Sequence, residues 1–281
     1  MKVVSTLEEL RAFRGGMAAP FGLVPTMGYL HEGHLSLVRR AKAMCAAVGV
    51  SIFVNPTQFA PGEDLATYPR DLERDLGQLE PLGVDLVWTP QADEMYPQGF
   101  QTWVTVEDVT QMLEGARRPT HFRGVTTIVS KLFLAFQPDF AFFGQKDAQQ
   151  VVVVRRMSRD LNFPLKVVVC PTVREPDGLA MSSRNSYLDA DQRKAATVLH
   201  RALLAAKAAY DSGERQAGRL RQQMTDTLAG EPLARTEYVS VADPERLTEL
   251  EGRVETALLS MAVFVGKTRL IDNVVLGREG L

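Results

Sequence analysis

Cysteines are scarce in this sequence, and long apolar runs are missing. Cys45 and Cys170 are the only two cysteines in 281 residues, and they lie far apart along the chain. A disulfide framework is therefore not expected, and a reducing compartment is favoured. Residues 1–14 hold no continuous apolar stretch of the kind that a secretory signal needs, and no run approaches the length of a membrane span. We therefore expect a cytoplasmic protein.

An excess of charge of one sign is also missing. The chain has 32 basic and 34 acidic residues, for a net charge of −2. This balance argues against the basic surface that binds nucleic acid, and we expect neither a nucleic-acid nor a membrane partner. The hydrophobic share of 45% is ordinary for a globular protein, and the length suits one large domain or two smaller ones.

Strand-like and helix-like patterns alternate through the first part of the chain. Strands are predicted at residues 21–24, 48–54, 84–89, 140–144 and 166–173, and helices at 64–82, 125–136 and 148–161. Alternation of this kind is typical of a mainly parallel sheet with helices on both faces. We predict an α/β fold in which residues 1–176 form a Rossmann-like N-terminal domain.

The pattern changes after Pro176-Asp177-Gly178, which is a strong turn signal. Helices are predicted at residues 189–212 and 215–229, followed by strands at 236–241, 256–265 and 269–276. Two helices and then consecutive strands favour a smaller α+β C-terminal domain, residues 177–281.

The most informative segment runs from Val24 to His34. An apolar strand leads into a turn with Pro25 and Gly28, and a helical pattern follows. His31 and His34 are three residues apart near the start of that helix, so they share one of its faces. Because a helix N-terminus offers free N–H groups and a positive dipole end, the segment predicts a nucleotide triphosphate site.

Zinc is the alternative for these histidines. His31-Glu32-Gly33-His34 is one residue shorter than the H-E-x-x-H spacing, and no cysteine or third histidine lies at ligand spacing. We therefore predict no protein-bound metal here and favour imidazoles that donate to phosphate oxygens.

Three further segments carry polar side chains suited to the same chemistry. Lys146 follows a strand and suits phosphate, while Gln149 and Gln150 suit a small polar substrate. The hydroxyls and guanidinium of residues 182–184 suit phosphates, and Asn55 and Gln58 follow another strand. Each segment taken alone is also compatible with ordinary capping or a strand-end turn.

Together, in this order, the motifs resemble those of the pantothenate synthetase family, one of the His-x-x-His nucleotidyl transferases. The motifs are residues 25–34, Phe53–Phe59, Tyr68-Pro69-Arg70, Arg118–Val125, Gly144–Gln150 and Ser182–Asn185. The resemblance runs from about Leu7 to Asp272-Asn273. It implies a ligase that joins pantoate to β-alanine with ATP, through a pantoyl adenylate, and releases pyrophosphate and then AMP.

The resemblance also implies residue roles. His34, His31, Lys146 and Arg184 would act in catalysis, Gln58 and Gln150 would bind pantoate, and Gln58 would also meet β-alanine. ATP would be bound by Met27, Gly28, Tyr29, Leu30, His31, Glu32, Gly33, His34, Gly144, Gln145, Lys146, Asp147, Val173, Met181, Ser182, Ser183 and Arg184. Mg²⁺ would be carried on the ATP phosphates, with Asp75 a candidate ligand by position. A homodimer is implied, and residues 177–281 are a candidate lid that shields the acyl adenylate from water.

Two positions depart from the family pattern. Gln145 replaces the usual Glu, and Thr57 stands where Met is frequent. Two other functions fit the same motifs: a simple nucleotidyl transferase acting on a phosphorylated substrate, and a regulatory module that binds nucleotide without turnover. The second domain and the paired glutamines disfavour the first, and the set of phosphate-directed cations disfavours the second.

Overall fold

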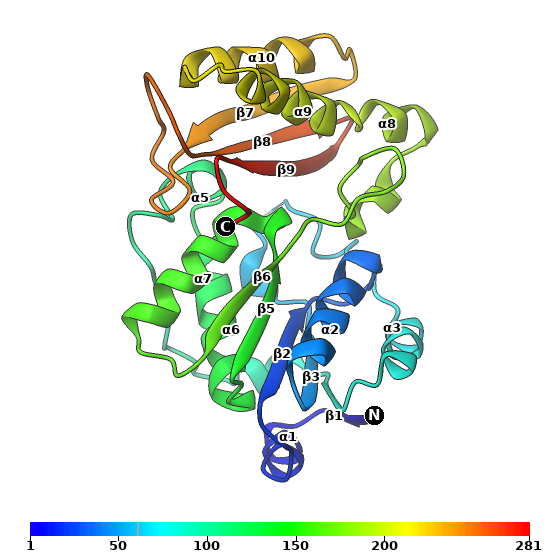
Figure 1. The fold of residues 1–281 in the computed structure, drawn as a ribbon. Helices are drawn as coiled ribbons and strands as arrows, with labels where there is room; N and C mark the ends of the chain where they lie inside the picture. The colour runs from blue at the N-terminus through cyan, green and yellow to red at the C-terminus, as the bar shows by residue number, and fades with distance from the viewer. Residues whose placement is uncertain (61) are drawn as a thin grey trace. The chain divides into compact units, whose positions relative to one another are not determined.

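Six parallel strands form the main sheet, in the order β1-β4-β3-β2-β5-β6 (Figure 1). The strands are β1 (Lys2–Val4), β2 (Phe21–Thr26), β3 (Ala47–Ile52), β4 (Leu86–Trp88), β5 (Phe140–Gly144) and β6 (Lys166–Cys170). Val24, Val50 and Phe142 are fully buried, as expected for parallel strands covered on both faces. The predicted parallel α/β sheet is confirmed. Sequence reasoning missed only the short β1, and it placed the end of β6 three residues too late.

The computed structural model describes residues 1–60 and 62–281. The contacts among them divide into two units, of which the first comprises Met1–Gly144 and Val153–Cys170. The second unit comprises Gln145–Val152 and Pro171–Leu281. Each unit has its own sheet.

Helices cover both faces of the parallel sheet. A Cβ atom on Gly22 would lie 2.9 Å from Sγ of Cys45, the C-cap residue of α2, whereas one on Gly49 would lie 2.7 Å from the ring of Phe136 of α6. Glycine thus lets α2 approach one face and α6 the other. The helices are α1 (Leu7–Arg14), α2 (Glu32–Met44), α3 (Leu72–Leu79), α4 (Ala92–Met95), α5 (Leu113–Arg117), α6 (His121–Phe136) and α7 (Ala148–Asp160), with short 3₁₀ turns η1 (Pro56–Gln58), η2 (Glu80–Leu82) and η3 (Gln145–Asp147).

Helix boundaries differ from the prediction in two places. The helix predicted for residues 64–82 begins only at Leu72, because Pro69 interrupts the pattern and Asp71 caps the new start by accepting the Arg74 N–H over 3.1 Å. The helix predicted from residue 125 starts earlier, at His121.

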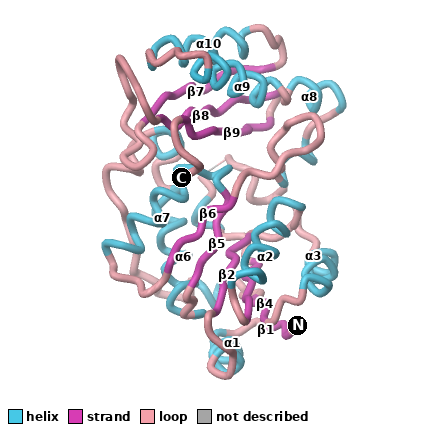
Figure 2. The backbone as a smooth tube through the Cα atoms, in the orientation of Figure 1, coloured by secondary structure: helices cyan, strands magenta, loops and turns pink. Residues whose placement is uncertain are grey.

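The second unit holds a three-stranded antiparallel sheet of β7 (Ala234–Ala242), β8 (Ala257–Val265) and β9 (Thr268–Leu276) (Figure 2). The predicted α+β pattern is therefore confirmed. The single helix predicted for residues 189–212 is wrong, because it is divided at Ala196 and Thr197, where the Thr197 N–H donates to the Lys194 carbonyl only three residues back, over 3.3 Å. The remaining helices are η4 (Ser183–Tyr187), α8 (Ala190–Ala195), α9 (Val198–Asp211) and α10 (Ala217–Ala229).

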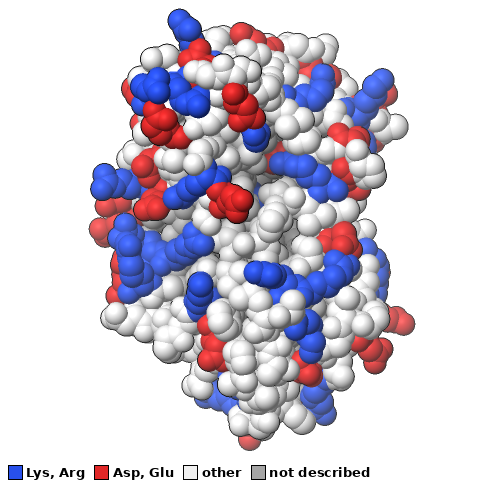
Figure 3. Space-filling model, in the orientation of Figure 1, with Lys and Arg blue, Asp and Glu red and all other residues white. Residues whose placement is uncertain are grey.

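Charged side chains of both signs lie on the face of the molecule that Figure 3 draws, where acidic side chains are interspersed among the basic ones. Within residues 1–60 and 62–281, no helix is long and apolar enough to cross a membrane.

Candidate active site

The turn between β2 and α2 is held in an unusual backbone conformation. Gly28 has a φ of 83° and Tyr29 a φ of 50°, both in the left-handed region that side chains disfavour. The Thr26 hydroxyl accepts the Gly28 N–H over 3.2 Å and donates to the Ser51 carbonyl of β3 over 2.8 Å. The sheet therefore fixes the first half of the turn.

Asp75 of α3 fixes the second half. Its two carboxylate oxygens accept the backbone N–H groups of Tyr29 and Leu30, each over 2.7 Å, and its side chain is only 1% exposed. Burial raises the pKa of the Asp75 carboxyl, and the two backbone hydrogen bonds oppose that shift. Asp75 is thus tied to the backbone immediately before His31, a duty that sequence position alone did not reveal.

The two histidines cap α2 reciprocally. His31 is the N-cap residue, and its Nδ1 accepts the Gly33 N–H over 3.2 Å, while Nδ1 of His34 accepts the His31 N–H over 3.3 Å. An imidazole nitrogen that accepts a backbone N–H carries no proton, so each neutral ring carries its proton on Nε2. The ring centroids are 4.1 Å apart. The cap therefore fixes the tautomer of both rings and holds them side by side, confirming the predicted position at a helix start.

Leu30 and Glu32, on either side of His31, differ in their surroundings. The Leu30 side chain is 1% exposed and packs in the core, so its contact with a ligand would come from its backbone. The Glu32 carboxylate forms a salt bridge with Arg39 further along α2. The hydrogen bonds from Arg39 lower the pKa of Glu32, so this exposed group stays ionised.

The side-chain amide of Gln58 is oriented by Asn55. Asn55 is 1% exposed and donates to Gln58 Oε1 over 2.8 Å, while the Tyr96 hydroxyl donates to Asn55 Oδ1 over 2.8 Å. Asn55 also donates to the Gly124 carbonyl of α6 over 3.2 Å. The bond from Asn55 uses one acceptor site of Gln58 Oε1 and fixes the orientation of the side-chain amide. Tyr96 is a residue that sequence reasoning missed.

The backbone carbonyl of Gln58 is held as well. His121 Nδ1 donates to it over 2.9 Å and Arg118 Nη2 over 3.1 Å, and Arg118 forms a bidentate salt bridge with Glu63 at 2.6 and 2.7 Å. Burial and the Arg118 charge lower the pKa of His121 to about 4, so its ring is neutral near pH 7. Burial opposes ionisation of Glu63, but Arg118 outweighs it and lowers the pKa of that carboxyl. Arg118 and His121 both belong to the motif 118–125, but nothing in the sequence indicated that they donate to the Gln58 carbonyl.

These groups meet at one edge of the parallel sheet. The strands β3, β2 and β5 are neighbours, and the Gln58 segment, the histidine turn and Gly144 follow their carboxyl ends. That edge is where open α/β sheets bind ligands.

In the second unit, a hairpin brings other predicted residues together. The Met181 N–H donates to the Val173 carbonyl over 3.0 Å, and Gly178, with a φ of 93°, turns the chain between them. The Ser182 hydroxyl then caps η4 by accepting the Arg184 N–H over 3.3 Å. The predicted residues of Val173 and 181–184 thus form one local structure. Lys146 lies in η3, where its ammonium is 3.6 Å from the Asp147 carboxylate.

No group of three or more His, Cys, Asp or Glu side chains is arranged to hold a metal within the described part of the chain. Gln78 lies three residues after Asp75 on α3, and its buried Oε1 has no hydrogen-bond partner among the described residues. Carboxylate and amide oxygens are ligands that Mg²⁺ accepts. The two side chains therefore fit a shared role toward a metal carried on phosphates.

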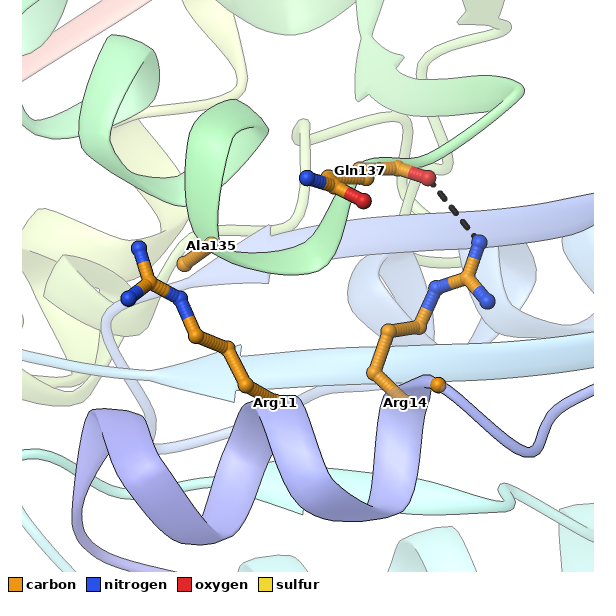
Figure 4. A pocket seen from close by; sticks show the side chains of 5 residues that line it. Arg11, Arg14, Ala135 and Gln137 are labelled. Carbon is orange, nitrogen blue, oxygen red and sulfur yellow. Dashed lines mark hydrogen bonds between the residues drawn. The ribbon is translucent and has the colours of Figure 1, made fainter.

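Figure 4 shows a hollow elsewhere in the first unit, lined by Arg11, Arg14, Gly15, Ala135 and Gln137. Arg14 donates to the carbonyls of Phe136 and Gln137 over 2.7 and 3.0 Å, and its guanidinium lies 4.1 Å from the ring centroid of Phe21. Phe21 begins β2, so the hollow lies at the amino edge of the sheet, opposite the edge with the histidines. It contains none of the predicted site residues in the described part of the chain.

The sequence of this chain is similar to those of known proteins. A family model described as pantoate–β-alanine ligase matches residues 2–275. A pantothenate synthetase of Herpetosiphon aurantiacus is 60% identical over 277 residues, covering 98% of this chain and 100% of the relative. A pantothenate synthetase of Chloroflexus aurantiacus is 59% identical over 281 residues, which is 100% of both chains.

Solved structures match as well. The crystal structure of pantothenate synthetase from Thermus thermophilus has a TM-score of 0.93 at 50% identity, covering 98% of this chain and 99% of that one. Pantoate–β-alanine ligase from Francisella tularensis, complexed with β,γ-ATP and β-alanine, has a TM-score of 0.81 at 33% identity, covering 100% of this chain and 99% of that one.

Proposed function

The chain belongs to the pantoate–β-alanine ligase family, and from that premise we propose how its residues carry out the ATP-dependent joining of pantoate to β-alanine. The observation that carries the proposal is the reciprocal cap of α2, which leaves the Nε2–H of His31 and His34 as the donor ends of two adjacent rings. Donors fixed before the reaction stabilise charge that develops on a leaving group without reorganising.

In the first step, a pantoate carboxylate oxygen bonds to the α-phosphorus of ATP, and the bond from that phosphorus to the bridging oxygen breaks. Pyrophosphate leaves with the extra negative charge, which His31 and His34 stabilise together with Lys146 and Arg184. The remaining predicted ATP residues, from Met27 through Gly33 and in the segments 144–147, 173 and 181–183, position the nucleotide.

In the second step, the neutral amine of β-alanine attacks the acyl carbon of the adenylate. The C–N bond forms, the bond from the acyl carbon to the phosphate oxygen breaks, and AMP leaves while the nitrogen loses a proton. Gln58 and Gln150 hold pantoate through their amides, and Gln58 also meets β-alanine. The bonds from Asn55, Arg118 and His121 support this role, because they fix Gln58 at both its side chain and its backbone.

Mg²⁺ supplies charge neutralisation on the ATP phosphates when it is bound. Among the described residues, Asp75 and Gln78 would hold it, since a carboxylate that accepts two N–H groups still has lone pairs and Gln78 Oε1 has no hydrogen-bond partner there. The ordinary task of Asp75 is to hold the turn before His31.

We also propose that residues 177–281 form a lid that shields the adenylate from water. We further propose that the chain works as a homodimer and that it acts in the cytoplasm. Sedimentation analysis of the purified chain tests whether it is a homodimer.

The experiment that tests the function is a product assay. ATP, pantoate and β-alanine are incubated with the protein, and AMP and pantothenate are measured by mass spectrometry. Formation of both in equal amounts supports the proposal. Transfer of AMP to a phosphorylated acceptor would favour a simple nucleotidyl transferase, and nucleotide binding without any product would favour a regulatory module.

A further inference from the structure

Asn273 of β9 connects the C-terminal sheet to the loop that carries Lys146. Its side-chain NH₂ group donates to the Gln145 carbonyl over 3.0 Å and to the Lys146 carbonyl over 2.8 Å. Asn273 is only 3% exposed. Both partners are acceptors, so the NH₂ end of the amide, and not its oxygen, must face them. The residue thus uses both of its side-chain donors on one short loop.

The position of Asn273 is itself fixed by a partly buried ion pair. Asp272 accepts the Asn273 N–H over 2.8 Å and forms a bidentate salt bridge with Arg174 at 2.6 and 2.9 Å. Arg174 also donates to the Gly178 carbonyl over 3.1 Å. The same pair therefore holds the turn that precedes the segment 181–184.

The two carbonyls that accept hydrogen bonds from Asn273 lie on either side of the Lys146 Cα atom. The Gln145 carbonyl belongs to the peptide plane before the Lys146 Cα, and the Lys146 carbonyl belongs to the plane after it. Because peptide units are planar, fixing both of them fixes the direction in which the side chain leaves the backbone. The Oδ1 atom of Asn273 is buried and has no partner among the described residues, an arrangement with an energetic cost. The two donated bonds offset that cost.

We propose that Asn273 is a positioning residue for Lys146 and thereby for the phosphates of ATP. The inference rests on the proposed function, in which Lys146 stabilises the leaving pyrophosphate. Misplacement of a reacting group by about 1 Å can cost about 10²-fold in rate. Replacing Asn273 therefore slows adenylation even though the side chain itself contacts only the loop.

The test is a double-mutant cycle with pyrophosphate release as the readout. Asn273→Ala is expected to lose about 10- to 10²-fold in rate. Added to Lys146→Ala, it should cause less than about a threefold further loss, because a residue that acts through Lys146 has nothing left to position. Asn273→Ser keeps one hydroxyl donor and should retain more activity than Asn273→Ala. It also serves as the second variant if the alanine form does not fold.

Ser260→Ala is the matched control. Ser260 lies opposite Asn273 in the β8–β9 register and is 6% exposed, and its hydroxyl has no partner among the described residues. We expect this variant to keep wild-type activity. The inference is overturned if Asn273→Ala and Asn273→Ser stay within about threefold of wild type, or if the losses of Asn273→Ala and Lys146→Ala multiply in full. A wild-type chain without pantoate-dependent pyrophosphate release would instead overturn the proposed function.

Discussion

The backbone N–H of His31 donates to Nδ1 of His34 over 3.3 Å, so one histidine determines which nitrogen of the other carries a proton. The capping box normally places Glu or Gln at the position of His34. A histidine there performs the same capping and also presents an N–H from the opposite side of the ring. In the proposed function, the cap and the phosphate donor are therefore one side chain.

Replacing His34 separates these two tasks. His34→Ala removes both and is expected to lower the adenylation rate by roughly 10²–10³-fold, the range for one lost transition-state donor. His34→Glu keeps an acceptor for the His31 N–H but offers no donor to phosphate. We expect it to keep near wild-type thermal stability and to be as inactive as the alanine variant. Activity of His34→Ala within a few fold of wild type would remove His34 from the mechanism.

Asp75→Asn tests the anchor of the turn. An amide has one acceptor oxygen, so one of the N–H groups of Tyr29 and Leu30 loses its partner. We expect a stability loss of about 1–3 kcal/mol in urea unfolding, together with slower adenylation. The matched control is Asp71→Asn on the same helix, since Asn also caps a helix start well. Equal behaviour of the two variants would contradict the anchoring role.

The fold was largely predictable because its strands are short apolar runs and its turns carry Pro and Gly. What escaped prediction depends on tertiary contacts. β1 is three residues long and is defined by its pairing with β4, which no local pattern indicates. The break between α8 and α9 falls at Ala196 and Thr197, and the sequence there holds no Pro or Gly that would indicate it.

The site was predictable only in part. The residues that we propose face ATP and pantoate were named from motifs, and several of them follow strand ends. The groups that hold them could not, because their partners are distant in sequence: Asp75 bonds a turn 45 residues earlier, and Asn273 bonds a loop 127 residues earlier. His121 belongs to a recognised motif, but no pattern in the sequence predicts its hydrogen bond to the Gln58 carbonyl.

Asn55→Ala should impair pantoate binding selectively. Without the donor from Asn55, the Gln58 amide can rotate, and one net hydrogen bond of about 1.4 kcal/mol corresponds to about tenfold in affinity. We expect KM for pantoate to rise by about that factor while KM for ATP stays unchanged. Tyr96→Phe, which removes a bond one step further away, should show a smaller rise. A larger effect on ATP than on pantoate would argue against this assignment.

His121 makes stability depend on pH. Its pKa is about 4 in the folded chain against 6.5 as the ordinary value, so the unfolded chain binds more protons between these limits. Stability is therefore lost as the pH falls through this window. His121→Gln keeps an N–H donor for the Gln58 carbonyl but does not titrate there. We expect the urea midpoint of the wild type to fall more steeply from about pH 7 to about pH 5 than that of the variant. Parallel slopes would show that His121 does not titrate as described.

In the proposed function, His31, His34 and their partners activate pantoate by transferring AMP to it from ATP before β-alanine reacts. Exchange of labelled pyrophosphate into ATP measures that step alone. We predict exchange that requires pantoate, proceeds without β-alanine, and falls by roughly 10²–10³-fold in His34→Ala. Exchange that appears only after β-alanine is added, or that proceeds without pantoate, would contradict it.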